Sequence, residues 1–155
     1  ENMAELAAFC TGSWAISAET DAGSGSWEAA ACRCLQDLEI LEPDWLALLK
    51  QWEQAPELPG FAPQDPEKLE RIAVYFAFRY LLKAVNDGDL LGRAQFCALG
   101  VLVTDRLSRF VGLPEALRLF SREIEHNGDN LDTLLEQFWQ TEGLSLSALL
   151  AAFGG

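Results

Sequence analysis

The sequence predicts an all-α protein, an orthogonal or up-down bundle of about seven helices around one long antiparallel helix hairpin. Apolar residues recur at spacings of i, i+3 and i+4 from about residue 27 to the end of the chain, as in amphipathic helices. No Asn-Gly or Asp-Gly turn stands between alternating apolar runs, the arrangement that predicts a β-hairpin. Capping and stop residues divide the chain into the expected helices.

The N-terminal part is expected to contain short helices and a flexible loop. Residues 11–26 are rich in Gly, Ser, Thr and Ala, which is typical of a loop. Ser26 suits the cap of one short helix and Pro43 the first turn of the next. Four prolines between residues 55 and 66 predict an extended connector.

This connector is expected to separate two parts of the chain. Residues 1–60 form the N-terminal part, and residues 61–155 form a C-terminal helical bundle. The length of 155 residues is that of one ordinary domain, so we expect the chain to fold as one compact unit.

The C-terminal part is expected to open with the long hairpin. Asp65 as cap and Pro66 at the first helical position predict a helix of about 20 residues. Gly88 suits a left-handed stop, and Asp89 can cap a second long helix that ends at Gly112. The short turn makes the two helices antiparallel neighbours.

Three shorter helices complete the prediction. Pro114 is expected to start a helix that Gly128 stops, and Asp129 or Asn130 to cap the next one. Residues 145–153 form the last helix.

The charge balance limits the classes of partner. The chain has 24 Asp and Glu against 11 Lys and Arg, a net charge of −13, which argues against nucleic-acid binding. The longest apolar run, residues 96–103, is far below the roughly 18 residues of a membrane span. The first nine residues lack the features of a signal peptide, so a cytoplasmic protein without a membrane partner is expected.

No metal or cofactor is expected in this chain. Cys10, Cys32, Cys34 and Cys97 lack the spacing of a zinc site or a disulfide framework, so we interpret them as reduced thiols. Glu-x-x-His, ending at the only His, His126, matches half of a di-iron motif whose second half is absent. Catalytic triads and phosphate-binding loops are not recognisable either.

Six polar residues share one side of the long helix that follows Pro66: Lys68, Arg71, Tyr75, Arg79, Lys83 and Asn86. This stripe is either the solvated face of the helix or a docking strip for carboxylates of another domain. Arg79 lies mid-helix between Phe78 and Tyr80, where we expect a carboxylate to hold it.

Residues 121–127, Ser-Arg-Glu-Ile-Glu-His-Asn, are a second dense polar segment. On an α-helical wheel Arg122 and Glu125 can pair at i, i+3 on the outer face. Glu123 lies on the flank of the docking face and is expected to pair with Arg79. His126 suits a helix C-terminus, or a hydrogen bond with Glu123 or Asn130.

The amino-acid sequences of two segments resemble the C-terminal region of the flagellin lysine N-methylase family. They are Tyr-Phe-Ala-Phe-Arg-Tyr-Leu-Leu-Lys-Ala-Val-Asn-Asp-Gly-Asp-Leu-Leu at 75–91, and 121–127 followed by Asn130. The similarity covers about residues 66–140. It implies transfer of methyl groups from S-adenosylmethionine to lysines of flagellin or a similar protein. It also implies an iron-sulphur centre or another metal in an N-terminal cysteine cluster of the full-length family.

The four cysteines do not reproduce that cluster. The chain is therefore either a C-terminal fragment, partnered by the cysteine-rich region, or a member without the metal site. We expect a helical domain that assists lysine methylation and is inactive alone. The alternative is a non-catalytic interaction or homodimerisation module, in which aromatic residues form the core and a dimer surface: Trp45, Trp52, Phe61, Phe138 and Trp139.

Nine residues are candidate contacts to substrate or to another domain: Arg79, Lys83, Asp87, Asp89, Arg122, Glu123, Glu125, His126 and Asn130. Asp87, Asp89, Glu123 and Glu125 carry the carboxylates suited to bind a lysine ammonium and to accept its proton.

Overall fold

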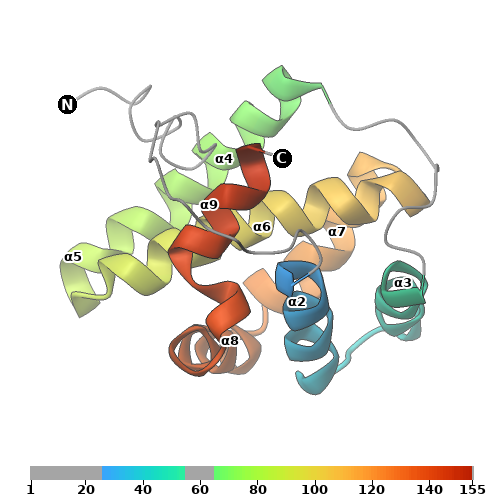
Figure 1. Ribbon diagram of the computed structural model, residues 1–155, viewed down its shortest axis with the longest axis horizontal. Coiled ribbons are helices and arrows are strands. Elements are labelled where there is room, and N and C mark those ends of the chain that lie inside the picture. Colours follow the sequence, from blue (N-terminus) through green and yellow to red (C-terminus); the bar gives the residue numbers. More distant parts are fainter. Residues whose placement is uncertain (1–25, 55–64, 155) are drawn as a thin grey trace.

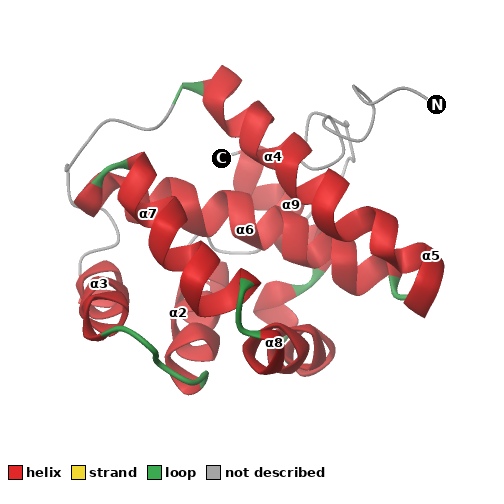
Figure 2. Cartoon of the chain, turned by 180° about the vertical axis from the view of Figure 1, so that it is seen from behind, coloured by secondary structure: helices red, strands yellow, loops and turns green. Residues whose placement is uncertain are grey.

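The computed structural model describes residues 26–54 and 65–154, and every regular element in these ranges is helical (Figure 2). The all-α prediction is therefore confirmed. In chain order the elements are α2 (Ser26–Asp37), α3 (Pro43–Gln54), α4 (Pro66–Tyr80), the 3₁₀ turn η1 (Leu81–Lys83), α5 (Ala84–Asp87), α6 (Leu90–Val111), α7 (Leu113–Phe120), the π-helical turn η2 (Ser121–Glu125), α8 (Gly128–Gln140), the 3₁₀ turn η3 (Glu142–Leu144) and α9 (Leu146–Gly154).

Helix α6 is the centre of the fold. It contacts α3, α4, α7, α8 and α9, which surround it in Figure 1. Its residues between 94 and 105 are all buried. A helix that is apolar on every side is expected to be enclosed in this way.

Four aromatic rings join α4, α6 and α7 in the middle of this core. Phe76 packs edge-on against Phe96 at 6.0 Å and against Phe120 at 5.7 Å, and Tyr80 lies 4.7 Å from Phe96. Gly100 lets the helices approach, because a Cβ atom added there would meet the Phe76 ring at 3.0 Å. Edge-on aromatic packing of this kind favours a fixed core geometry.

The expected hairpin signals are confirmed. Asp65 caps α4 by accepting from the Glu67 N–H, and Gly88 ends α5 at a φ of 74°. Asp89 then caps α6 by accepting from the Gly92 N–H at 2.9 Å. The expected 20-residue helix is not one regular α-helix, because η1 tightens it after Tyr80, as 3₁₀ turns often do near helix ends.

The connection between α7 and α8 differs from the prediction. Gly128 begins α8 instead of stopping the preceding helix, and the cap is Asn127, whose side chain accepts from the Asn130 N–H at 3.2 Å. The helix from Leu113 widens into the π turn η2, closed by the bond from the His126 N–H to the Ser121 carbonyl. Both expected caps, Asp129 and Asn130, are therefore wrong. Asp129 lies inside the first turn of α8, and the side chain of Asn130 bonds the backbone of Glu39 and Glu123.

Helices α2 and α3 pack on the C-terminal helices through their tryptophans. Trp27, Trp45 and Trp52 are buried in the same apolar cluster as α6. Trp45 lies edge-on to Phe120 at 6.4 Å. Phe138 is buried as well, whereas Trp139 is exposed. Four features of the prediction lie outside the described residues: the expected connector at 55–64, Phe61, Cys10 and the expected loop before residue 26.

None of the helices in the described ranges is long and apolar enough to cross a membrane.

Replacing Phe76 by Ala should lower the free energy of unfolding by about 3 to 5 kcal/mol, because it leaves a cavity where three helices meet. Urea denaturation measures the change. Phe78→Ala, an exposed neighbour on the same helix, is the matched control and should cost about 0.5 kcal/mol or less. Equal effects of the two substitutions would contradict the central position of Phe76.

Candidate functional site

Glu123 is a fully buried carboxylate that holds the backbone between α2 and α3. Its relative exposure is 0%. It accepts hydrogen bonds from the Leu41 N–H at 2.9 Å and from the Glu42 N–H at 2.6 Å. The expected pairing of Glu123 with Arg79 is therefore wrong, because these amides, distant in sequence, take both carboxylate oxygens.

Asn130 completes this attachment. Its side chain accepts from the Glu39 N–H at 2.9 Å and donates to the Glu39 carbonyl at 2.8 Å. It also donates to the backbone carbonyl of Glu123 at 2.9 Å. Glu123 and Asn130 together, called the clasp below, thus fix residues 39–42 against the corner between η2 and α8. Both candidate residues serve the fold.

Arg122 and Arg118 reinforce the same linker from the surface. Arg122 lies 2.7 Å from the carboxylate of Glu42 and Arg118 3.1 Å from it. The hydrogen bond from Arg118 is the main cause that lowers the pKa of Glu42. The expected pair of Arg122 with Glu125 does not form, because a π turn holds more residues per turn and i, i+3 positions no longer align.

Glu125 points to α4 and meets a group of tyrosines. Its side chain is 4% exposed. One carboxylate oxygen accepts from the Tyr75 hydroxyl at 2.9 Å and from the Tyr80 hydroxyl at 2.8 Å. Arg79 donates to the Tyr80 oxygen at 3.1 Å and lies 3.7 Å from the same Glu125 oxygen. The expected carboxylate partner of Arg79 thus comes from the predicted segment, but it is Glu125.

The two tyrosines act as hydrogen-bond donors in this group. Burial and the hydrogen bond to Glu125 raise the pKa of Tyr75 and of Tyr80 above the ordinary value. Both hydroxyls therefore keep their protons at neutral pH. They donate hydrogen bonds that hold the carboxylate in place.

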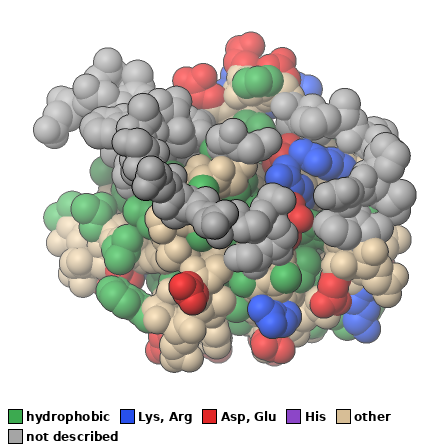
Figure 3. Space-filling model, viewed as in Figure 1, with side chains coloured by type: hydrophobic (Ala, Val, Ile, Leu, Met, Phe, Trp, Pro, Cys, Tyr) green, Lys and Arg blue, Asp and Glu red, His purple; other side chains and the backbone are tan. Residues whose placement is uncertain are grey.

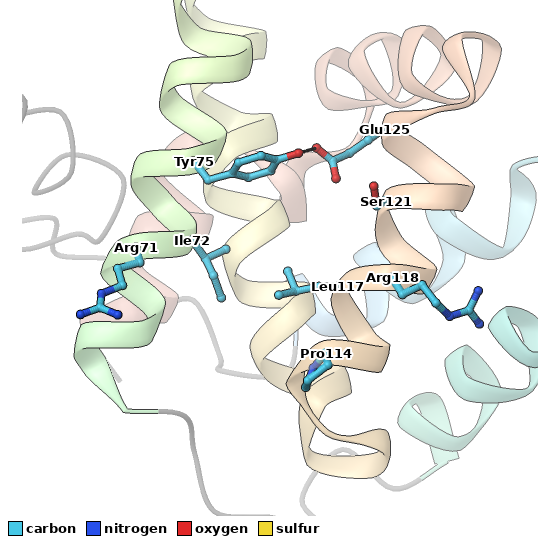
Figure 4. Close-up of a pocket in the computed structure, with 8 residues that line it drawn as sticks. All are labelled: Arg71, Ile72, Tyr75, Pro114, Leu117, Arg118, Ser121 and Glu125. Carbon is cyan, nitrogen blue, oxygen red and sulfur yellow. Dashed lines mark hydrogen bonds between the residues drawn. The ribbon is translucent and has the colours of Figure 1, made fainter.

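A pocket of about 470 Å³ lies between α4 and α7, with Glu125 at one end (Figure 4). Ile72 and Leu117 face each other across it, and Tyr75 points to Glu125. The second oxygen of Glu125 accepts no hydrogen bond from any described residue and lies on the side of Ser121 in the figure. The pocket has apolar walls and one carboxylate end.

The two arginines that line the pocket extend away from it on opposite sides. Arg71 is ion-paired with Glu67. Arg118 meets Glu115 at 2.8 Å as well as Glu42. The arginines at the edges of the pocket are therefore paired with carboxylates, and Glu125, 3.7 Å from Arg79, is the acidic group at its end.

The remaining candidate residues do not line this pocket. Asp87 meets Arg93 at 2.7 Å, and Asp89 is the cap of α6. Lys83 is exposed and lies over the Tyr80 ring at 5.3 Å. His126 lines a second hollow beside Arg118, Ser121 and Arg122. Its ring forms no hydrogen bond with the clasp in the described part of the chain.

The described cysteines do not fit the metal centre of the family that the sequence resembles. Cys32 and Cys34 are buried. Burial raises the pKa of Cys32 to about 12 and that of Cys34 above its usual value. Within residues 26–54 and 65–154 no three Cys, His, Asp or Glu side chains are grouped to hold a metal ion.

Sequence reasoning missed most of the pocket. Tyr75 was recognised only as part of a polar stripe, and Tyr80 only as a neighbour of Arg79. Ser121 was recognised only as the first residue of the polar segment 121–127. The π turn that brings Glu125 to the tyrosines has no recognisable sequence pattern.

Comparison with protein-family models, curated proteins and solved structures finds no match for this chain.

Glu123→Ala should lower the free energy of unfolding by about 3 kcal/mol, because it leaves two partly buried backbone N–H groups without an acceptor, each worth about 1 to 3 kcal/mol. Chemical denaturation with circular dichroism measures this change. Glu136→Ala, which removes an exposed carboxylate on α8, is the control and should change stability by about 0.5 kcal/mol or less. If Glu123→Ala were as mild as the control, the clasp would not be a stabilising contact.

Proposed function

We propose that this chain is the C-terminal helical domain of a lysine N-methylase-like protein, and that the pocket between α4 and α7 binds the lysine side chain of a protein substrate. Flagellin or a similar protein is the proposed substrate. The observation that supports this most directly is the carboxylate of Glu125, with one oxygen at the end of an apolar pocket and without a described donor.

A lysine side chain fits this chemistry at both ends. Its four methylene groups are apolar and suit walls made by Ile72, Pro114 and Leu117. Its ammonium group needs oxygen acceptors, which the Glu125 carboxylate supplies. The Tyr75 ring next to it offers an aromatic surface of the kind that attracts cations.

The candidate carboxylates are not equivalent in this proposal. Glu123 is used by backbone amides, Asp87 by Arg93 and Asp89 by the start of α6. Glu125 meets Tyr75, Tyr80 and Arg79 through one oxygen and lines the pocket. The net charge of −13 adds a general attraction for lysine-bearing segments.

The proposed role of this chain is recognition. The resemblance assigns S-adenosylmethionine and the iron-sulphur centre to the full-length family. The tyrosines beside Glu125 keep their protons, so removal of a proton from the ammonium is not assigned to them. The domain would hold the lysine and the cysteine-rich region would complete methyl transfer.

A pentapeptide with one central lysine, acetylated and amidated at its ends, should bind this pocket at least about tenfold more tightly than the same peptide with norleucine, a difference of about 1.4 kcal/mol. Norleucine keeps the apolar stem and lacks the ammonium group. Chemical-shift titration of the full chain gives the affinity and reports on residues that line the pocket.

Glu125→Gln should reduce lysine-peptide affinity by about tenfold, since it removes the carboxylate charge. Glu136→Gln is the matched control, because it makes the same change of net charge at an exposed carboxylate on α8, outside the pocket lining. Equal affinities for lysine and norleucine peptides, or an unchanged affinity in Glu125→Gln, would contradict the proposed function.

A further inference from the structure

The end of the pocket between α4 and α7 carries a second oxygen-bearing side chain, that of Ser121. Ser121 and Glu125 both line the pocket and are the first and last residues of η2. Side chains four positions apart lie on the same side of a helix, and Figure 4 shows the Ser121 hydroxyl pointing toward Glu125. The π turn therefore brings a hydroxyl and a carboxylate to the same end of the pocket.

Two oxygen atoms at this end are open to hydrogen bonds from a ligand. Tyr75 and Tyr80 donate to the same carboxylate oxygen of Glu125, at 2.9 and 2.8 Å. Arg79 lies 3.7 Å from that oxygen as well. No described residue donates to the second oxygen or forms a hydrogen bond with the Ser121 hydroxyl. A ligand therefore meets two acceptors, the second Glu125 oxygen and the Ser121 hydroxyl.

The size of the pocket and its aromatic lining do not favour one methylation state of a lysine. Its volume of about 470 Å³ is within the range of sites that hold whole small molecules, so added methyl groups have room. Sites that select methylated ammonium groups enclose them in cages of aromatic rings. Tyr75 is the one aromatic side chain among the described residues that line this pocket, so these residues form no such cage.

Electrostatic attraction does not separate the methylation states either. A lysine keeps its single positive charge when it is methylated, and the net charge of −13 attracts every form equally. Figure 3 shows Asp and Glu side chains at several separate places on the face that it draws, instead of gathered in one patch. Any selection among the forms therefore depends on hydrogen bonds.

We propose that the pocket selects lysine side chains with at least two N–H bonds, which are unmethylated and monomethylated lysine, over dimethyllysine and trimethyllysine. This inference rests on the proposed function, in which the pocket binds a lysine side chain. An unmethylated ammonium group has three N–H bonds and a monomethylated one has two, so either can serve both the Glu125 oxygen and the Ser121 hydroxyl. A dimethylated group serves only one of these acceptors, and a trimethylated group serves none. Acceptors that lose their water without gaining a donor cost affinity.

Five pentapeptides test this selection on the full chain by chemical-shift titration. They differ only at the central position, which carries unmethylated, mono-, di- or trimethylated lysine, or norleucine. The unmethylated and monomethylated peptides should bind within about twofold of each other, the dimethylated one about fivefold more weakly and the trimethylated one at least about tenfold more weakly.

Ser121→Ala assigns the second acceptor. With the Glu125 oxygen alone, one N–H bond is enough, so the dimethylated peptide should bind within about twofold of the unmethylated one, while the trimethylated peptide stays weaker. Ser147→Ala, which removes an exposed hydroxyl on α9 outside the pocket lining, is the matched control and should keep the fivefold difference. A merely structural role of Ser121 would weaken all peptides alike and leave their ratios unchanged.

The outcomes separate this inference from the proposed function. If lysine binds more tightly than norleucine but trimethyllysine or dimethyllysine binds as tightly as lysine, the selection is overturned and the proposed function stands. An unchanged ratio of dimethyllysine to lysine in Ser121→Ala also overturns it. Equal binding of the lysine and norleucine peptides contradicts the proposed function, and the inference fails with it.

Discussion

The structure depends on a buried carboxylate. Glu123 has no solvent contact, and its two oxygens accept the amides of residues 41 and 42, more than 80 positions earlier in the chain. A buried charge is costly unless hydrogen bonds compensate it. Asn130 supports the arrangement by pairing with the backbone on both sides, at Glu39 and at Glu123 itself. The clasp therefore determines how α2 and α3 attach to the C-terminal helices.

The same π turn serves the fold and the candidate site. Glu123 and Glu125 leave η2 toward opposite neighbours, one toward the linker before α3 and the other toward Tyr75 and Tyr80 on α4. Because the clasp fixes the position of η2, it also fixes where Glu125 meets the pocket. π turns inside helices often occur at functional sites, and here the turn joins a structural carboxylate to a candidate binding carboxylate.

Local signals in the sequence were enough to predict the helices. Contacts between residues far apart in the sequence could not be predicted from it. Asp65, Gly88 and Asp89 act on residues within four positions, so their capping roles could be predicted from spacing alone. The partners of Glu123 could not be predicted, because they are backbone amides of a distant linker, and no pattern of side chains marks such groups in a sequence. The expected carboxylate contact of Arg79 exists, but the regular helical wheel assigned it to the wrong glutamate. The pocket depends on how α4 and α7 are placed relative to each other, and the hydrophobic periodicity of the sequence gives no information about that placement.

Amide hydrogen exchange at Leu41 and Glu42 tests the role of the clasp most directly. If Glu123 holds this linker as the structure indicates, both amides should exchange only when the protein unfolds globally, with the same opening free energy as amides in the middle of α6. Glu123→Gln loses one acceptor oxygen, so the Leu41 or Glu42 amide should exchange faster in this variant. The α6 amides should change only as much as the free energy of global unfolding changes. Exchange of both amides at the rate of an unstructured loop in the unaltered protein would contradict the account.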